Sequence, residues 1–280
     1  MTPIFNPVMR GKLVFLGLLS VQITGSGMRT PEKTSSIPLQ NNSVIQSTAL
    51  DIYRQYLSSH KKITAGENPD LETVNRVGNQ VIVAVKDYYK AKGAAKELEG
   101  FFWEINFIEE RKADAWCFPG GKMAVYSSLL PVTQSEGSLA AVLAHEIAHV
   151  VLKHGDIRMK QYLKQYLGGK DLAASLAANP VETKDFFRMA YANGDYVGVI
   201  RGFDTKDEMA ADELGAILTA MAGYKAQEAV VFLERMIWFR NTGRTPEFVL
   251  SHPIDEKRTE RLKEIVDDIA RKYYRPISKN

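Results

Sequence analysis

The chain has 280 residues, of which 45% are hydrophobic and 25% are charged, as in a globular protein with one large or two small domains. Lys and Arg total 36 and Asp and Glu total 33, so the net charge of +3 gives no electrostatic footprint for nucleic acid. A single cysteine, Cys117, excludes an intrachain disulfide framework and any metal site built from several thiolates. Histidines and carboxylates would therefore have to supply the ligands of any metal site.

The first 27 residues have the pattern of a secretory signal peptide. Arg10 and Lys12 precede an apolar run over 13–21, and small residues follow at 25–27. The run is shorter than the roughly 20 apolar residues that a membrane-spanning helix needs. We therefore expect 1–27 to be a signal peptide, or alternatively an uncleaved signal anchor. The protein is then expected to be exported, or to be membrane-associated on the extracytoplasmic side if the segment is an anchor.

A linker and one domain are predicted after the signal segment. Residues 28–43 are rich in Thr, Ser, Pro and Asn, which is typical of a linker, and 44–280 form the predicted domain. The domain begins with a mostly helical pattern. It predicts a helix over 44–57 and a second helix that starts at Asn68-Pro69-Asp70 and repeats valines at helical spacing.

A short strand pair is predicted in the middle of the chain. Trp103, Ile105 and Phe107 alternate with polar residues, as in a half-buried strand. The turn at 119–121 allows 123–126 to pair back as a second strand. The fold class expected is therefore mainly α with a small antiparallel β element.

The helical pattern resumes near Leu139 and continues almost to the C-terminus, apart from an interruption over 168–202. That interruption is long for a loop, and its residues 195–198 suggest a lid that moves when substrate binds. Plain packing is the alternative for these residues.

The segment His145-Glu146-Ile-Ala-His149 carries the clearest chemical signal. On a helix, His145 and His149 lie one turn apart on one face and can hold one ion, while Glu146 beside them can reach a metal-bound water. This H-E-x-x-H pattern is the zinc metalloprotease signature, and chance predicts on the order of 0.006 occurrences in such a chain. Two core histidines beside an incidental glutamate are the alternative. It fits poorly, because the surrounding run is apolar and buried charged groups are rare unless paired or metal-bound.

A third metal ligand must come from outside this motif. The metzincin arrangement needs a glycine and a histidine at the positions of Leu152 and Gly155. His154 is about half a turn out of phase with His145, so we expect it to point away from the metal. Its expected role is that of a polar residue in the last helical turn, with Gly155 as the C-terminal cap.

A downstream carboxylate is the remaining option for the third ligand. Glu208 and Asp212 are four residues apart at the start of an apolar helix, so they share one face. Glu208 fits a ligand, and Asp212 fits a residue that hydrogen-bonds a ligand histidine. Spacing alone leaves Glu213 open as the ligand. Without the upstream motif, the cluster would be a charged first turn that complements the helix dipole.

Four sequence blocks together are similar to those of a known family. They are 115–130 with Pro119-Gly120-Gly121, the His145 motif, 208–215, and Ser251-His252-Pro253 with Arg258. In this order they resemble the HtpX and CAAX prenyl endopeptidase family of gluzincin metallopeptidases (peptidase family M forty-eight), especially its soluble periplasmic branch. The resemblance implies a zincin-like fold and one zinc ion per chain. It also implies His145, His149 and Glu208 as zinc ligands and Glu146 as the catalytic base.

The last block and the departures from the family pattern complete the expected site. His252 is expected in a loop, where it would stabilise the oxyanion, cap the zinc in a resting state or only fix the turn. Arg258 would tether this loop through a carboxylate, or else be a surface charge. Asp114 stands where the family usually has Asn, and Ser128 and Ala210 replace a frequent Gly and Glu, but no ligand is lost.

The function expected is that of an exported zinc metalloendopeptidase that hydrolyses misfolded or damaged cell-envelope proteins. Its partners would be polypeptides, which the strand 103–107 could bind at its edge, and association with membrane or envelope complexes is left open. A periplasmic chaperone or assembly factor on a protease fold, with little turnover, is the main alternative. A metal-binding structural protein is the third. The presence of every predicted ligand and of the base favours the protease.

Overall fold

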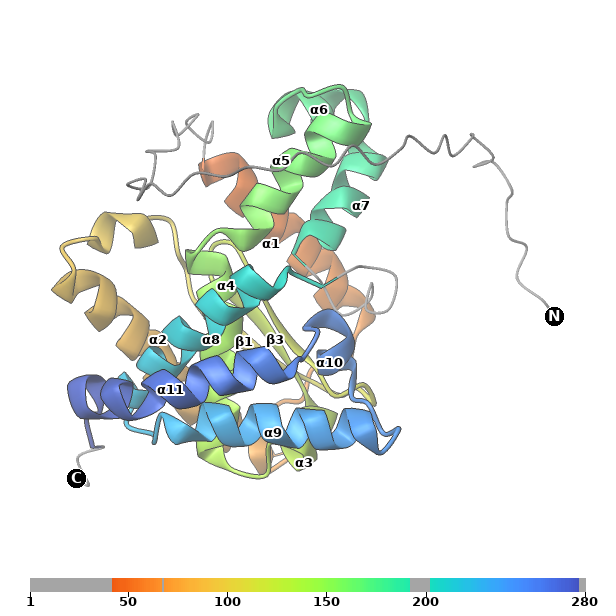
Figure 1. Cartoon of the computed structure of the whole chain (residues 1–280). Coiled ribbons are helices and arrows are strands. Elements are labelled where there is room, and N and C mark those ends of the chain that lie inside the picture. Colours follow the sequence, from red (N-terminus) through yellow and green to blue (C-terminus); the bar gives the residue numbers. More distant parts are fainter. Residues whose placement is uncertain (1–41, 67, 192–201, 277–280) are drawn as a thin grey trace, which may run out of the picture. The chain divides into compact units, whose positions relative to one another are not determined.

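A computed structural model describes residues 42–66, 68–191 and 202–276 (Figure 1). The predicted signal peptide, most of the predicted linker and the suggested lid residues 195–198 lie outside these residues. Within the described ranges, none of the helices combines the length and the apolar character that crossing a membrane requires.

Three short strands form one mixed sheet. They are β1 Glu104–Ile108, β2 Ala115–Phe118 and β3 Lys122–Tyr126. β3 lies between the others, parallel to β1 and antiparallel to β2. The expectation that 123–126 pairs antiparallel to the first strand is therefore wrong, because the turn at 119–121 closes a hairpin with β2. Sequence periodicity misses β2 because all four of its residues are buried, so its side chains do not alternate in polarity.

The hairpin turn depends on two glycines. Gly120 and Gly121 have φ angles of 86° and 80°, a left-handed conformation that costs glycine little. A Cβ atom at Gly121 would also lie 2.7 Å from the ring of Trp103. The turn therefore requires glycine both for its backbone conformation and for the close approach of this aromatic ring.

The helices before the sheet match the sequence prediction. They are α1 Asn42–Ser59 and α2 Asp70–Ala91, followed by the short 3-10 helix η1 Ala95–Leu98. The valines at helical spacing in α2 are buried. Asn68 caps this helix, since its Oδ1 accepts a hydrogen bond of 2.8 Å from the backbone N–H of Asp70.

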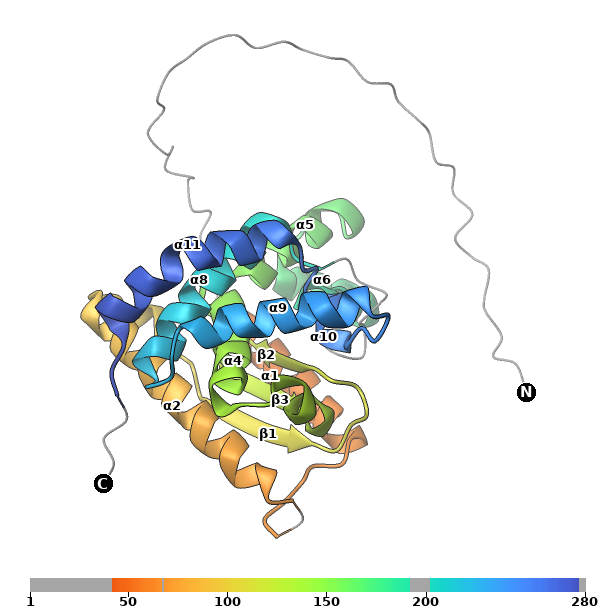
Figure 2. The ribbon, with the colours of Figure 1, turned by 60° about the horizontal axis from the view of Figure 1, so that its bottom comes forward.

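A buried helix occupies the centre of the fold. α4 Glu136–Val151 follows η2 Ser127–Leu129 and α3 Leu130–Thr133, and all but its first residue are buried. It packs most extensively against α8 Thr205–Met221 and also contacts β2, α2 and α9 Gln227–Asn241 (Figure 2). A Cβ atom at Gly215 would lie 3.2 Å from the Cα and N atoms of His145. Glycine therefore lets α8 approach the backbone of α4 at the metal-binding motif.

Part of the predicted interruption over 168–202 is helical, so that expectation is wrong for 172–190. α5 His154–Tyr166 is followed by α6 Leu172–Ala178 and α7 Pro180–Ala190. Asp171 caps α6 and Pro180 starts α7, which are local helix signals that the aromatic and glycine residues nearby obscure. The C-terminal part contains α10 Glu247–Ser251 and α11 Glu256–Tyr273.

The sheet separates two clusters of the hydrophobic core. Phe107, Ala115 and Val125 belong to the larger cluster, to which α2, α4, α8, α9 and α11 contribute. Ile108, Trp116 and Tyr126, on the alternate positions of the same strands, belong to a second cluster with α1, α5 and α7. This architecture confirms the predicted mainly α class with a small sheet.

Candidate metal centre

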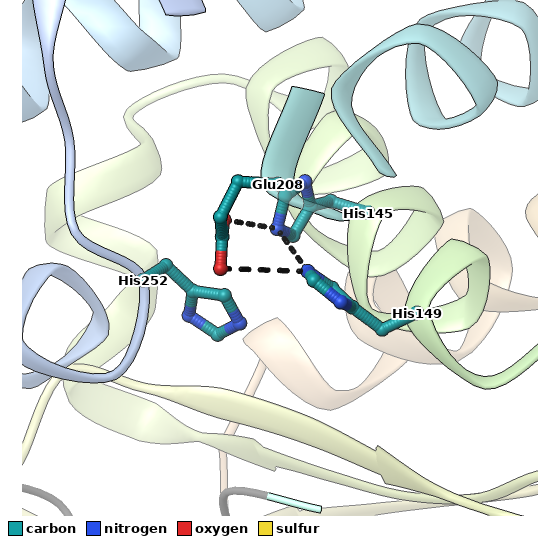
Figure 3. Close-up of side chains that lie close together, drawn as sticks. All are labelled: His145, His149, Glu208 and His252. Atoms are coloured by element: carbon teal, nitrogen blue, oxygen red, sulfur yellow. Dashed lines mark hydrogen bonds and ion pairs between the residues drawn. The ribbon is translucent and has the colours of Figure 1, made fainter. Parts of the chain in front are cut away.

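Four buried side chains from three elements converge in the interior. His145 and His149 come from α4, Glu208 from the first turn of α8, and His252 follows α10 directly (Figure 3). Between 0% and 6% of each residue is exposed. One possible ligand atom from each of them lies within 4.8 Å of the others. The structure thus brings the three sequence-predicted ligands and His252 to one point.

The distances between the donor atoms suit one metal ion. His145 Nε2 lies 2.9 Å from His149 Nε2 and 3.5 Å from Glu208 Oε2, while His149 Nε2 lies 3.8 Å from Glu208 Oε1. In a tetrahedral zinc site with bonds of about 2.1 Å, neighbouring donor atoms lie about 3.4 Å apart. Both carboxylate oxygens of Glu208 are fully buried, and the guanidinium of Arg258 pairs with Oε2, at 2.8 Å. Oε1 has no hydrogen-bond partner among the described residues, so a cation bound at this centre would satisfy it.

Glu146 lies against this group without belonging to it. Its Oε1 is 3.2 Å from His252 Nε2 and receives no hydrogen bond from the described residues. Burial raises the pKa of the Glu146 carboxyl well above its ordinary value, while the charge of His145 opposes this. The carboxyl is therefore placed to exchange a proton with a group bound at this centre.

Asp212 and Arg258 contact the predicted metal ligands and orient their side chains. Asp212 Oδ1 lies 3.0 Å from His145 Nδ1, so this histidine keeps Nε2 free for the donor group. Arg258 donates from Nε and Nη2 to the two oxygens of Asp212, both at 2.8 Å, and its Nη1 lies 2.8 Å from Glu208 Oε2. Arg258 Nη1 also donates to the carbonyl of Pro253 at 2.9 Å, which is the loop tether suggested by the sequence. The residue is 1% exposed, so the alternative of a surface charge is wrong.

The alternative ligand left open by spacing is not part of this group. Glu213 is exposed, whereas Glu208 and Asp212 are buried on the face of α8 that packs on α4. Helix geometry explains the difference, because residues four apart share a face and residues five apart begin to leave it.

The charges within the centre balance one another. Burial lowers the pKa of His145, but hydrogen bonds and charge from Asp212 and Glu208 outweigh it and raise this pKa to about 9. Burial alone would raise the pKa of the Asp212 carboxyl, but the guanidinium of Arg258 holds it well below its usual range. Burial lowers the pKa of His252 to about 4, so its imidazole is neutral near pH 7.

A short helix holds His252 in place. The backbone N–H of Phe248, in α10, donates to the carbonyl of Ala113 at 3.1 Å, and Glu247 Oε2 accepts from the N–H of Ala113 at 2.9 Å. His252 stacks on the Phe248 ring at 4.5 Å, and its Nδ1 lies 3.2 Å from the Phe248 carbonyl. A proton on Nδ1 therefore has an acceptor, which leaves the lone pair of Nε2 facing the donor group.

The sequence prediction for the segment after His149 is wrong. α4 ends at Val151, Lys153 adopts a φ of 62°, and His154 starts a new helix rather than ending the first one. Gly155 lies inside α5, where a Cβ atom would collide with the Tyr191 ring, and so it is not a C-terminal cap. The sequence analysis placed the helix end at Gly155, because no glycine or proline at 152–154 marks the earlier end.

Two residues contact His149 that the sequence analysis did not place there. His154 Nδ1 lies 2.9 Å from His149 Nδ1, and the Phe203 ring stacks on the His149 ring at 4.3 Å. Phe203 lies just before α8, in a part of the sequence where no pattern distinguishes a ring that covers a ligand from an ordinary core residue.

Comparison with known proteins gives a family match and several relatives. The family described as Peptidase family M48 matches residues 75–266. Mitochondrial metalloendopeptidase OMA1 of Schizosaccharomyces pombe is 25% identical over 270 residues, which cover 93% of this chain and 74% of that protein. A putative beta-barrel assembly-enhancing protease of Vibrio cholerae is 28% identical over 219 residues, covering 74% of this chain and 41% of that protein. OMA1 of Saccharomyces cerevisiae is 30% identical over 175 residues, covering 59% and 47%.

The family match contains the whole donor group and its supporting residues. It begins in α2 and ends in α11, so it includes both histidines of the motif, Glu208, His252 and Arg258. The matched part is well over half of the chain, although the chain spans less than half the length of the Vibrio cholerae and Saccharomyces cerevisiae relatives. The metallopeptidase resemblance of the four sequence blocks is thereby confirmed, and the chain belongs to peptidase family M48.

Proposed function

We propose that this protein is a zinc-dependent metalloendopeptidase whose centre is formed by His145, His149, Glu208 and Glu146. The observation that carries this proposal is the convergence of two Nε2 atoms on a buried carboxylate whose Oε1 has no hydrogen-bond partner among the described residues. Glu146 stands directly beside this group, and such a pairing of a metal site with a carboxyl base is what peptide hydrolysis requires.

The donor set fits zinc better than other common divalent ions. Imidazole nitrogens with one carboxylate suit zinc, whereas calcium and magnesium prefer oxygen ligands alone. When bound, zinc would polarise a water molecule and the carbonyl of the scissile peptide. Asp212 and Arg258 would hold His145 and Glu208 in the orientation that binding requires.

Glu146 would move the proton of the reaction. Its Oε1 is buried at the centre and receives no hydrogen bond from the described residues, so it can accept a proton from the attacking water. The same carboxyl would then donate this proton to the leaving nitrogen of the peptide. Its raised pKa suits the first step, because a raised pKa makes the carboxylate a stronger base.

His252 would hold the metal in the resting arrangement. The acceptors around Nδ1 and the neutral state of its ring favour a lone pair on Nε2, and a lone pair binds a cation but cannot donate to an oxyanion. Among the three roles open for this residue, capping the metal therefore has the most support. Substrate would then have to replace His252 at the centre.

The natural substrates are proposed to be misfolded or damaged cell-envelope proteins. The support comes from the predicted signal peptide at 1–27, the linker at 28–43 and the similarity to proteins named beta-barrel assembly-enhancing protease. An exported, periplasmic or membrane-associated location follows from the same features, as does association with envelope protein complexes. Binding along β1 has less support, because the backbones of Lys61 and Ile63 already hydrogen-bond at Glu109 and Phe107 near the end of this strand.

A substitution of the base tests the proposal directly. The Glu146→Gln protein should keep one zinc per chain, while its hydrolysis of casein should fall by at least about a hundredfold, since general base catalysis contributes about that much or more. Glu213→Gln, on the exposed face of α8, is the matched control and should cleave like wild type. Equal cleavage by wild type and Glu146→Gln would refute the mechanism. Suppressed aggregation without any cleavage by wild type would favour the chaperone alternative.

A further inference from the structure

The two histidines of the motif have different partners on their second nitrogen. His145 Nδ1 faces a carboxylate, Asp212, at 3.0 Å. His149 Nδ1 faces another imidazole, that of His154, at 2.9 Å. Metal-binding histidines usually donate their second N–H to a carboxylate, a carbonyl or water, and this contact fixes which nitrogen carries the lone pair. An imidazole nitrogen can either donate or accept, so a further contact must favour the form of His154 that accepts the Nδ1–H of His149.

The break between α4 and α5 creates this contact. In a continuous helix His154 would point away from the motif, because five residues after His149 it is out of phase. The left-handed conformation of Lys153 ends α4 and turns the chain, so that His154 becomes the first residue of α5 and faces back toward His149. The contact is buried, since His154 and His149 are 6% and 4% exposed.

The charge of Asp207 favours the tautomer of His154 that accepts at Nδ1. Its Oδ1 lies 3.8 Å from His154 Nε2, on the side of the ring opposite to His149. A carboxylate there favours a proton on His154 Nε2, which leaves the lone pair on Nδ1 to accept the Nδ1–H of His149. The order Asp207, His154, His149 therefore places the lone pair of His149 on Nε2, where the donor group converges.

Packing alone does not decide which ring nitrogen of His149 carries the proton. Phe203 stacks on the His149 ring at 4.3 Å and the guanidinium of Arg158 covers the Phe203 ring at 3.7 Å, so the plane of the His149 ring is already held. An aromatic stack leaves both ring nitrogens equivalent, however, and only a polar partner on Nδ1 selects the tautomer that binds a metal through Nε2.

We propose that His154 is a positioning residue of the metal centre, which holds His149 in its metal-binding tautomer and whose own tautomer is favoured by the charge of Asp207. The inference rests on the proposed function, since it assumes that the donor group binds zinc. His149 is then oriented through two residues, His154 and Asp207, whereas the other histidine, His145, is oriented directly by the carboxylate of Asp212.

Amide substitutions separate this role from packing. Asn places its Oδ1 near the position of His Nδ1, whereas Gln places its oxygen near the position of Nε2. In the full chain, zinc affinity measured by competition with a chromophoric chelator should stay within about threefold of wild type for His154→Asn. It should fall by about 10- to 100-fold for His154→Gln and His154→Leu, the range for loss of an outer partner of a metal ligand. Asp207→Asn should lose a few-fold, and His60→Leu, far from the centre in sequence and at the end of α1, should lose nothing.

Each outcome decides the inference. Equal zinc affinity for the Asn and Gln proteins, or wild-type affinity for the Leu protein, would overturn it and leave the proposed function intact. Absence of zinc binding by wild type would refute both. If the Leu protein does not fold in its zinc-free form, as judged by its circular dichroism, the comparison of the Asn and Gln proteins still decides.

Discussion

Arg258 Nη1 lies 2.8 Å from Glu208 Oε2, and the other nitrogens of the same guanidinium hold Asp212. One buried cation thus neutralises a predicted metal ligand and the carboxylate behind another ligand. The pKa of both carboxyls is lowered by its charge, against the effect of burial. This arrangement makes Arg258 a structural requirement of the centre even when no metal is bound.

Replacement of this arginine should destabilise the fold strongly. Arg258→Met leaves two buried carboxylates without their cation, and removal of one partner of a buried pair costs about 3–5 kcal/mol. Zinc would compensate part of the loss, because it neutralises Glu208, so the variant should be weakest in its zinc-free form. Urea unfolding with and without zinc measures both effects. Arg261→Met, which breaks an exposed pair with Glu264, should change stability by less than about 0.5 kcal/mol.

Asp114 should make stability depend on pH. Burial raises the pKa of this carboxyl from 3.8 to about 8, and its Oδ2 has no hydrogen-bond partner among the described residues. The folded state therefore holds a proton that the unfolded state releases, so the free energy of unfolding falls as the pH rises from about 4 to about 8. Asp114→Asn should remove this decline and be more stable at pH 8 by at least about 1 kcal/mol. Parallel pH profiles of unfolding for wild type and variant would contradict the assignment, and Asp51→Asn on the exposed face of α1 is the control.

Close packing of α8 on α4 should be sensitive to one methyl group. Gly215→Ala introduces a Cβ atom 3.2 Å from the backbone of His145, and overpacking of this kind costs about 1–3 kcal/mol. The shift would also displace a predicted ligand, so zinc affinity should fall together with stability. Ala210→Val, on the exposed face of the same helix, should leave zinc affinity unchanged. Calorimetric titration of zinc into both variants provides the comparison.

Removal of the metal should lower thermal stability. A ligand present at about a thousandfold excess over its dissociation constant adds about 4 kcal/mol to the free energy of unfolding. A chelator should therefore lower the Tm of wild type by several degrees, and added zinc should restore it. Glu208→Gln should show a much smaller response to both reagents. A Tm that is identical with chelator and with zinc would contradict a zinc site in the folded protein.

His252 can be assigned by separating binding from turnover. If it caps the metal at rest, His252→Ala should weaken zinc binding by at least about tenfold, or about 1.4 kcal/mol. If it stabilises the oxyanion instead, zinc affinity should stay constant while kcat falls by about 100- to 1,000-fold. Chelator competition and casein turnover on the same preparation distinguish the two roles. No change in either quantity would leave His252 with the turn-fixing role.

Local spacing explains which parts of the site the sequence predicts. His145 and His149 are four residues apart, as are Glu208 and Asp212, so helix periodicity alone places each pair on one face. The contact of Arg258 with Glu208 depends on the crossing of two helices, and no spacing encodes it. Only the family pattern pointed to this arginine.

The errors of the sequence analysis have equally physical causes. Periodicity does not reveal β2, because its residues are buried on both faces. The end of α4 was placed too late, at Gly155, because Lys153 is a residue that rarely adopts a positive φ. A strand without alternating polarity and a helix end without glycine can be predicted only when the packing around them is known. The contact between His149 and His154 depends on where α4 ends, so it could not be predicted either.

The bond between His149 and His154 joins two layers of the molecule that otherwise have separate cores. His149 belongs to α4, whose apolar side chains contribute to the larger cluster, whereas α5 packs through Met159 and Leu163 into the cluster on the other face of the sheet. A packing defect in that second layer would therefore change the metal affinity. Phe187 in α7 is one such position. Residues that never approach the metal would then set how tightly it is held, and a screen for zinc affinity would find them on the far side of the sheet.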